Sequence, residues 1–274
     1  MTVAGDIRPF TDGDAEWVEQ RGALVRSHFS RVFQNHAQRF PSHDRLVAKF
    51  DQAVADAVAH GWPQFGKFID FHNELALAEL ILQQTSSAPT GVEYEARLPR
   101  SSRTIDFSLS YGDGRSTYVD AKTVRPKMID RWEQYEDIVS HDILTPGTEV
   151  ELHRGWLGGE LWHLKMASRA RFLEYARELE GKVRAAHGNG VFVLAFFCSG
   201  FHWHLDELED FVLFYKTGRH TAADPLAKME LHYIAQENCY LDRSIAHFAF
   251  FKRSTDSMSV ESGTWDVEPP RLPF

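Results

Sequence analysis

The chain has 274 residues, of which 43% are hydrophobic and 25% are charged, an ordinary globular profile with ample length for a sizeable core. No apolar run approaches the length of a membrane span, and the first residues lack the basic and apolar regions of a signal peptide. The two cysteines, Cys198 and Cys239, provide no disulfide framework and suggest a reducing compartment. We therefore expect a cytoplasmic protein with no membrane partner.

The net charge of −9 argues against nonspecific binding of polyanions, yet basic residues cluster locally. Arg97, Arg100 and Arg103 precede one predicted strand, and Arg125 and Lys127 follow another. These side chains could contact the phosphates of a nucleic acid, or they could simply solubilise loops. The sequence leaves both alternatives open.

Helical periodicity dominates the beginning of the chain, where we expect an N-terminal helical segment over residues 1–66. Apolar residues at helical spacing predict a first helix over 14–40, and Pro41 supplies a stop signal.

Two further helices are predicted before the first strand. Ser42 and Asp44 offer an N-cap for the second helix, and Gly61 followed by Pro63 is expected to end it. The third helix is predicted over 68–84, with apolar residues along one face.

Three short strands follow, at 92–98, 105–111 and 116–124, rich in β-branched and aromatic residues. The second and third are joined by Gly112-Asp113-Gly114, which is a strong signal for a hairpin. Both therefore belong to one antiparallel pair.

The second half of the chain alternates between helix and strand. An amphipathic helix is predicted over 166–186, and the apolar run 191–197 is typical of a strand covered on both faces. Another helix is expected after Asp206, and a last strand over 245–252.

The fold class follows from this order. Residues 68–197 read helix, three strands, helix, strand, which predicts an α/β (α+β) protein with a mixed central sheet flanked by helices. We expect one domain over 67–253 and a C-terminal tail over 254–274.

The hairpin register brings three charged residues together. If the loop has three residues, Tyr111 pairs with Arg115, and Asp106 then falls opposite Asp120. Lys122 shares a face with Asp120, because side chains alternate along a strand. The opposite face is predicted to be apolar and to carry Ile105, Phe107, Leu109, Val119 and Ala121.

Such a cluster has a chemical use. Opposed carboxylates about 4.5–5.5 Å apart at Cβ repel each other unless a cation or a proton lies between them. Mg²⁺ prefers oxygen ligands of this kind and activates water toward phosphoryl groups. Lys122 beside it could position or deprotonate the attacking water, since a neighbouring metal lowers the pKa of a lysine, or it could stabilise the developing charge. The combination predicts hydrolysis of a phosphodiester.

Ile105-Asp106, thirteen residues, then Asp120-Ala121-Lys122 resembles the D…(D/E)xK signature of the PD-(D/E)xK nuclease superfamily. Ile105 stands where that signature has its proline. The resemblance implies a restriction-endonuclease-like αβββαβ core and a nuclease that requires Mg²⁺ or Mn²⁺. It also implies that the substrate is DNA, cut internally in restriction, defence or repair.

The resemblance further implies a third acidic residue on the helix before the strands. Glu74 matches that position best and Glu79 second. The implied roles are metal binding by Glu74, Asp106 and Asp120, with Lys122 as the fourth catalytic residue; a homodimer or a partner subunit is also compatible.

Three alternatives stay open at this stage. The charges of Asp106, Asp120 and Lys122 could form a solvated, salt-bridged face of an edge hairpin. The fold could serve as an inert binding or assembly module, or the nuclease could cleave RNA instead of DNA.

Overall fold

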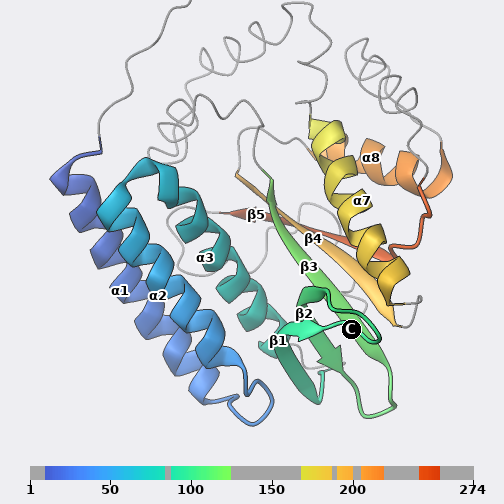
Figure 1. Ribbon diagram of the computed structural model, residues 1–274, viewed down its shortest axis with the longest axis horizontal. Helices are drawn as coiled ribbons and strands as arrows, with labels where there is room; N and C mark the ends of the chain where they lie inside the picture. Colours follow the sequence, from blue (N-terminus) through green and yellow to red (C-terminus); the bar gives the residue numbers. More distant parts are fainter. Residues whose placement is uncertain are drawn as a thin grey trace, which may run out of the picture.

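The computed structural model describes residues 10–83, 88–124, 168–186, 190–199, 205–218 and 241–253. Its centre is a five-stranded mixed sheet with helices on both faces (Figure 1). The protein is therefore α/β, and its described elements follow the predicted order of helix, three strands, helix and strand.

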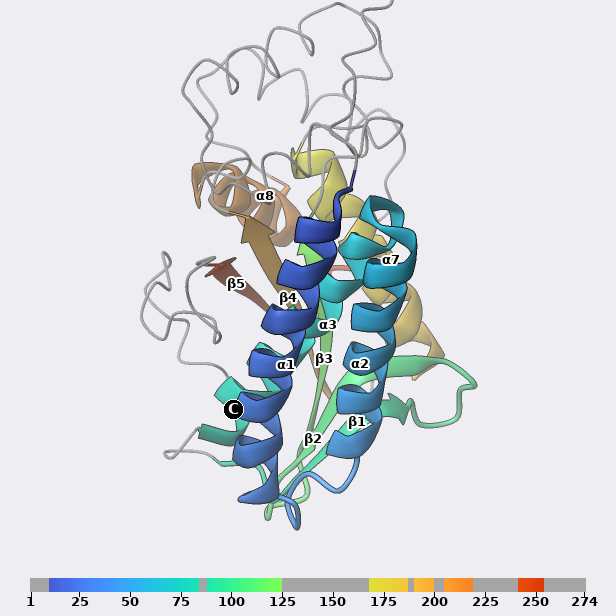
Figure 2. The ribbon, with the colours of Figure 1, turned by 90° about the vertical axis from the view of Figure 1, so that its left-hand side faces the viewer.

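Three helices form the layer on one face of the sheet: α1 (Asp12–Gln34), α2 (His43–His60) and α3 (Trp62–Gln83). They run side by side in both views (Figures 1 and 2). Thr11 begins α1 through a capping box with Asp14. None of the described helices combines the length and the apolar character needed to cross a bilayer.

Two predicted helix boundaries are wrong. α1 ends at Gln34 and not near residue 40, because the chain passes into successive turns, with the His36 N–H donating to Phe33 O. α3 begins at Trp62, so Pro63 lies in its first turn, where the missing N–H has no intrahelical partner to lose. Gly61, with a φ of 66°, ends α2 as predicted.

Ser42 directly precedes α2, yet its side chain makes no capping hydrogen bond. Its Oγ instead accepts a hydrogen bond from the Tyr94 N–H at 2.7 Å. Arg45 donates to Tyr94 O at 2.8 Å, and Arg39 O accepts from the Val92 N–H at 2.7 Å. The start of α2 and the residues before it thus bind the outer edge of the first strand.

The five strands lie in chain order across the sheet. The first three form an antiparallel meander, whereas the fourth is parallel to the third and the fifth parallel to the fourth. Their bounds are β1 (Gly91–Arg97), β2 (Thr104–Ser110), β3 (Ser116–Val124), β4 (Val191–Ser199) and β5 (His247–Arg253). Each begins and ends within two residues of its predicted position.

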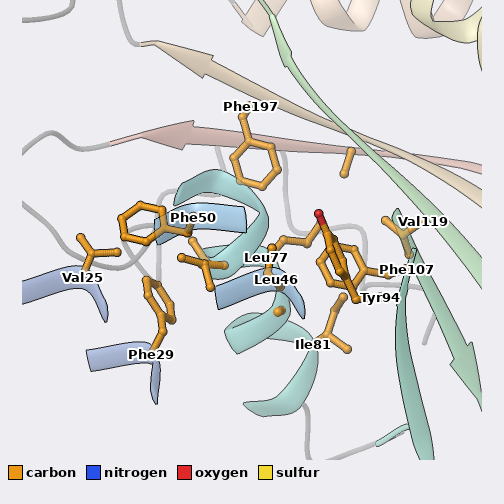
Figure 3. Close-up of a cluster of buried hydrophobic side chains, with 14 of the residues drawn as sticks. Val25, Phe29, Leu46, Phe50, Leu77, Ile81, Tyr94, Phe107, Val119 and Phe197 are labelled. Carbon is orange, nitrogen blue, oxygen red and sulfur yellow. The ribbon is translucent and has the colours of Figure 1, made fainter. Parts of the chain in front are cut away.

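The second helical layer consists of α7 (Ser168–Ala185) and α8 (Leu205–Thr217), both close to their predicted places. They cover the face of the sheet opposite α1–α3 (Figure 1). Alternate residues of β4 enter the two cores, with Val193 and Phe197 in the first and Phe192 and Phe196 in the second. The prediction of a strand buried on both faces is confirmed; Figure 3 shows part of the first core.

Candidate active site

The β2–β3 hairpin has the predicted register. The Tyr111 N–H donates to Arg115 O at 3.1 Å, and Phe107 pairs with Val119 at the far end of the ladder. Gly114 has a φ of 82°, a left-handed conformation that glycine adopts without steric cost. Asp106 and Asp120 directly follow the last pair and lie next to each other on neighbouring strands.

The sheet divides at these aspartates. β2 stays paired with β1 as far as Thr104, and β3 stays paired with β4 as far as Val124, but β2 and β3 are not paired beyond Phe107 and Val119. The Ala121 N–H donates to Asp106 Oδ2 at 2.7 Å. The Asp106 carboxylate thus accepts the hydrogen bond of a β3 backbone N–H at the point where the β2–β3 ladder has ended.

The predicted face of the sheet is wrong for Ile105. Phe107 lies in the core beneath α1–α3 as predicted, but Ile105 packs into the core beneath α7 and α8. The opposing residues of β1 change sides in the same way, since Tyr94 belongs to the first core and Ala96 to the second. Between them Glu95 has a φ of 50°, so the β1–β2 ribbon turns over here and strict alternation fails.

Asp120 lies on a central strand and is completely buried, with a relative exposure of 0%. Lys182 of α7 donates to its Oδ1 at 2.6 Å. Its Oδ2 lies 3.5 Å from Lys122 Nζ and has no hydrogen-bond partner among the residues that the structure describes. The charges are salt-bridged, but the alternative of a solvated face on an edge hairpin is wrong, because the Asp120 carboxylate has left water, lies on a central strand and is held by two partly buried amines.

Lys122 shares the side of β3 on which Asp120 lies, as predicted. Its Nζ donates to Glu178 Oε1 of α7 at 3.0 Å. Burial lowers the pKa of Lys122, but the carboxylates of Asp120 and Glu178 outweigh this effect, so that the pKa is raised above its usual value. The side chain is therefore a cation at neutral pH.

Glu74 of α3 lies near Asp106 of β2. The Tyr94 hydroxyl donates to Glu74 Oε2 at 2.6 Å. Burial and the charge of Asp106 raise the pKa of Glu74 well above its ordinary value, against the opposing effect of the Tyr94 hydrogen bond. Burial and the charge of Asp120 also raise the pKa of Asp106, to about 7. Both carboxyl groups thus lie where negative charge is poorly compensated.

Glu79, the second choice from the sequence, lies elsewhere. It accepts from Gln83 at 3.1 Å and is 3.0 Å from His28 Nε2 on α1. It therefore joins two helices of one layer, and of the two glutamates only Glu74 reaches the carboxylates of the hairpin.

A cavity of about 460 Å³ opens beside these groups. It is lined by Lys67, Asp70, Phe71, Asn73, Glu74, Asp106, Ala121, Lys122, Thr123, Tyr175 and Phe197. Asn73 donates to Thr123 Oγ1 at 2.9 Å, and within the described part of the chain its buried Oδ1 has no hydrogen-bond partner. The cavity therefore combines carboxylates, two amines and an unused acceptor, which suits a polar, charged ligand.

The fit of these residues to a divalent cation rests on their donor atoms. In the part of the chain described, no three His, Cys, Asp or Glu side chains already form a metal-binding group. The buried Oδ2 of Asp120, which has no hydrogen-bond partner among the described residues, and the poorly compensated carboxyls of Asp106 and Glu74 are nevertheless oxygen donors of the kind that Mg²⁺ and Mn²⁺ prefer. Burial and mutual repulsion raise the pKa values of Asp106 and Glu74, and a cation here would offset both effects.

Several site residues were missed from the sequence. Glu178 and Lys182 are four residues apart on α7, a spacing that usually indicates an exposed helix surface. Tyr94 and Asn73 gave no local signal, because one resembles an ordinary strand aromatic and the other a helix polar residue. Only the packing of α3 and α7 against the sheet brings them to the aspartates.

The arginines proposed to bind nucleic acid lie outside the cavity. Arg97, Arg100 and Arg103 are exposed around the β1–β2 connection, and none of them lines it. Arg125 and Lys127 fall outside the described residues.

Comparisons with models of protein families, with curated proteins and with solved structures gave no match.

Proposed function

We propose that this protein is a divalent-metal-dependent nuclease with the αβββαβ core of the PD-(D/E)xK superfamily. The observation that carries the proposal is the position of Asp106 and Asp120 where β2 parts from β3, with Lys122 on the side of Asp120. The raised pKa values of Asp106 and Glu74 support it, because buried acids with strongly perturbed pKa values beside a cavity are typical of functional sites.

Asp106, Asp120 and Glu74 are the residues that would hold Mg²⁺ or Mn²⁺. The bound ion would supply an activated water and Lewis-acid stabilisation of the phosphoryl oxygens. Lys122 remains cationic and lines the cavity, so its amine can bind a phosphate oxygen and stabilise the charge that develops during cleavage. Tyr94 orients Glu74 through its hydroxyl.

DNA as the substrate, internal cleavage and a role in restriction, defence or repair follow from the resemblance of the motif. RNA is the competing substrate, and a side-by-side panel of single- and double-stranded DNA and RNA distinguishes them.

The test removes the Lys122 amine. Lys122→Ala should remain folded, because Lys182 still neutralises Asp120, yet it should lose about 10²–10³-fold in the rate of Mg²⁺-dependent plasmid cleavage. Arg115→Ala is the matched control, since it removes a cation from the exposed turn of the same hairpin. Full activity in Lys122→Ala would remove this residue from the mechanism.

A second candidate is a catalytically inert binding or assembly module of the same fold. The observation in its favour is that the chain already balances the charges on β3, Asp120 with Lys182 and Lys122 with Glu178. Titration of the purified protein with Mn²⁺ separates the two functions. Folded protein that binds no Mn²⁺ would support the inert module.

A further inference from the structure

Helix α7 presents two opposite charges to the candidate site. Glu178 and Lys182 are separated by one helical turn, as are residues on the same face of a helix. Lys182 Nζ contacts Asp120 at 2.6 Å, and Glu178 contacts Lys122 Nζ at 3.0 Å. Asp120 and Lys122 are themselves 3.5 Å apart, so the four groups alternate in sign.

The pair between Lys182 and Asp120 is the more buried of the two contacts with α7. The Asp120 side chain is 0% exposed and that of Lys182 14%, whereas Glu178 is 50% exposed. A carboxylate without solvent depends on its neighbours for compensation, because burying an isolated charge is very costly. Lys182 supplies most of that compensation, since Glu178 shares the positive charge of Lys122.

We propose that Lys182 is a positioning residue that occupies Asp120 in the metal-free protein and competes with the divalent cation for this carboxylate. The inference rests on the proposed function, because it assumes that Asp120 is a metal ligand. The Lys182 amine acts as the protein's own cation at the site. It keeps Asp120 in place before the metal binds, and it weakens metal binding.

A merely structural ion pair predicts something different. Loss of a structural partner would destabilise the fold and leave the affinity for a cation unchanged. Loss of a competitor would destabilise the metal-free fold as well, but it would also raise the affinity for the cation, since the metal no longer has to displace an amine from Asp120. Cation affinity, measured without substrate, is therefore the deciding quantity.

The experiment measures Mn²⁺ binding by calorimetry at low ionic strength, without nucleic acid. Lys182→Met should bind Mn²⁺ roughly tenfold more tightly than the wild type, because removal of one positive charge close to the ion favours the metal strongly. Lys182→Gln keeps a hydrogen-bond donor without the charge and should shift the Kd in the same direction, which serves if the methionine variant fails to fold. Lys182→Arg keeps the charge and should stay near the wild type.

Arg184→Met is the matched control, because it removes a positive charge from the same helix at a residue that pairs with Asp242 and not with Asp120. Its Kd for Mn²⁺ should equal that of the wild type. Equal affinity in the wild type, Lys182→Met and Lys182→Gln would overturn the role of Lys182 and leave the metal site intact. Folded wild type and variants that all fail to bind Mn²⁺ would overturn the metal site itself, and the inference with it.

Discussion

At the scale of single residues, the candidate site holds more buried negative charge than its neighbours neutralise. Asp106 and Asp120 lie side by side, and Lys182 and Lys122 both contact Asp120. Asp106 accepts only the Ala121 N–H among its hydrogen bonds in the described part of the chain. Burial and the charge of Asp120 therefore disfavour the ionisation of Asp106 in the folded protein and raise its pKa to about 7.

Asp106→Asn should for this reason stabilise the metal-free protein. The pKa of Asp106 rises from an ordinary 3.8 to about 7 on folding. In EDTA the protonated Asp106 of the wild type costs no stability below pH 3.8, and the free energy of unfolding falls as the pH rises from there to about 7. Asparagine does not ionise, and the variant should gain about 2–4 kcal/mol in the free energy of unfolding at pH 8. Urea denaturation in EDTA at pH 4 and pH 8 measures the difference.

Asp113→Asn provides the comparison, because Asp113 lies in the exposed turn of the same hairpin and its pKa is lowered by hydrogen bonds from Arg115. This variant should show no gain. A stability difference between wild type and Asp106→Asn that does not change between pH 4 and pH 8 would contradict the account of Asp106.

The sequence predicts this site only in part. Asp106, Asp120 and Lys122 were predictable because a three-residue turn fixes the register of a hairpin locally. Lys182 is 62 residues from Asp120 in the chain, and its approach depends on how α7 packs on the sheet. The predicted face of Ile105 is wrong because the β1–β2 ribbon changes face at Glu95, and the alternation of side chains along a strand does not predict such a change.

At the scale of elements, strand positions followed closely from β-branched and aromatic runs, whereas helix ends did not. Pro63 predicts the end of a helix, although proline also suits the first turn of a helix, where the structure has it. The side chain of Ser42 was expected to cap α2 and instead holds β1. Where a residue suits two local structures, only the tertiary contacts decide which of them it adopts.

A close contact between α1 and α2 gives a test at this scale. A Cβ at Gly22 would lie 2.8 Å from Cγ2 of Val54, a β-branched side chain with little rotamer freedom. Gly22→Ala should therefore lower the free energy of unfolding by about 1–2 kcal/mol, despite the better helix propensity of alanine. Chemical denaturation of the variant measures the loss.

The sign should reverse once the neighbour is trimmed. In a Val54→Ala background the added methyl group meets the Cβ of residue 54 at an ordinary contact distance of 3.5 Å, and Gly22→Ala should then stabilise by about 0.5–1 kcal/mol through helix propensity. Stabilisation by Gly22→Ala in both backgrounds would mean that α1 and α2 are farther apart than described.

At the scale of the whole molecule, a net charge of −9 requires that any binding of nucleic acid use a local basic surface. Arg97, Arg100 and Arg103 are exposed, and the Arg103 guanidinium lies against Gly181, one residue before Lys182. If all three contact phosphates, changing them to Gln should reduce the slope of log K against log salt by about 2–3, at roughly 0.9 per contact. Fluorescence anisotropy of labelled duplex DNA in EDTA measures the slope.

Arg26→Gln combined with Arg31→Gln is the control, since both arginines are exposed on α1 in the other helical layer. That variant should leave the slope unchanged. An unchanged slope in the β1–β2 variant would assign these arginines to solubility alone.

The contacts at the outer edge of β1 also limit how this protein can assemble. The Tyr94 N–H donates to Ser42 Oγ, and Tyr94 O accepts from Arg45. The Val92 N–H donates to Arg39 O. A strand from a second molecule would need those same groups to continue the ladder. Joining of two sheets through Val92 and Tyr94 of β1 is therefore closed, and pairing of strands between two molecules would have to use the opposite edge of the sheet, at β5.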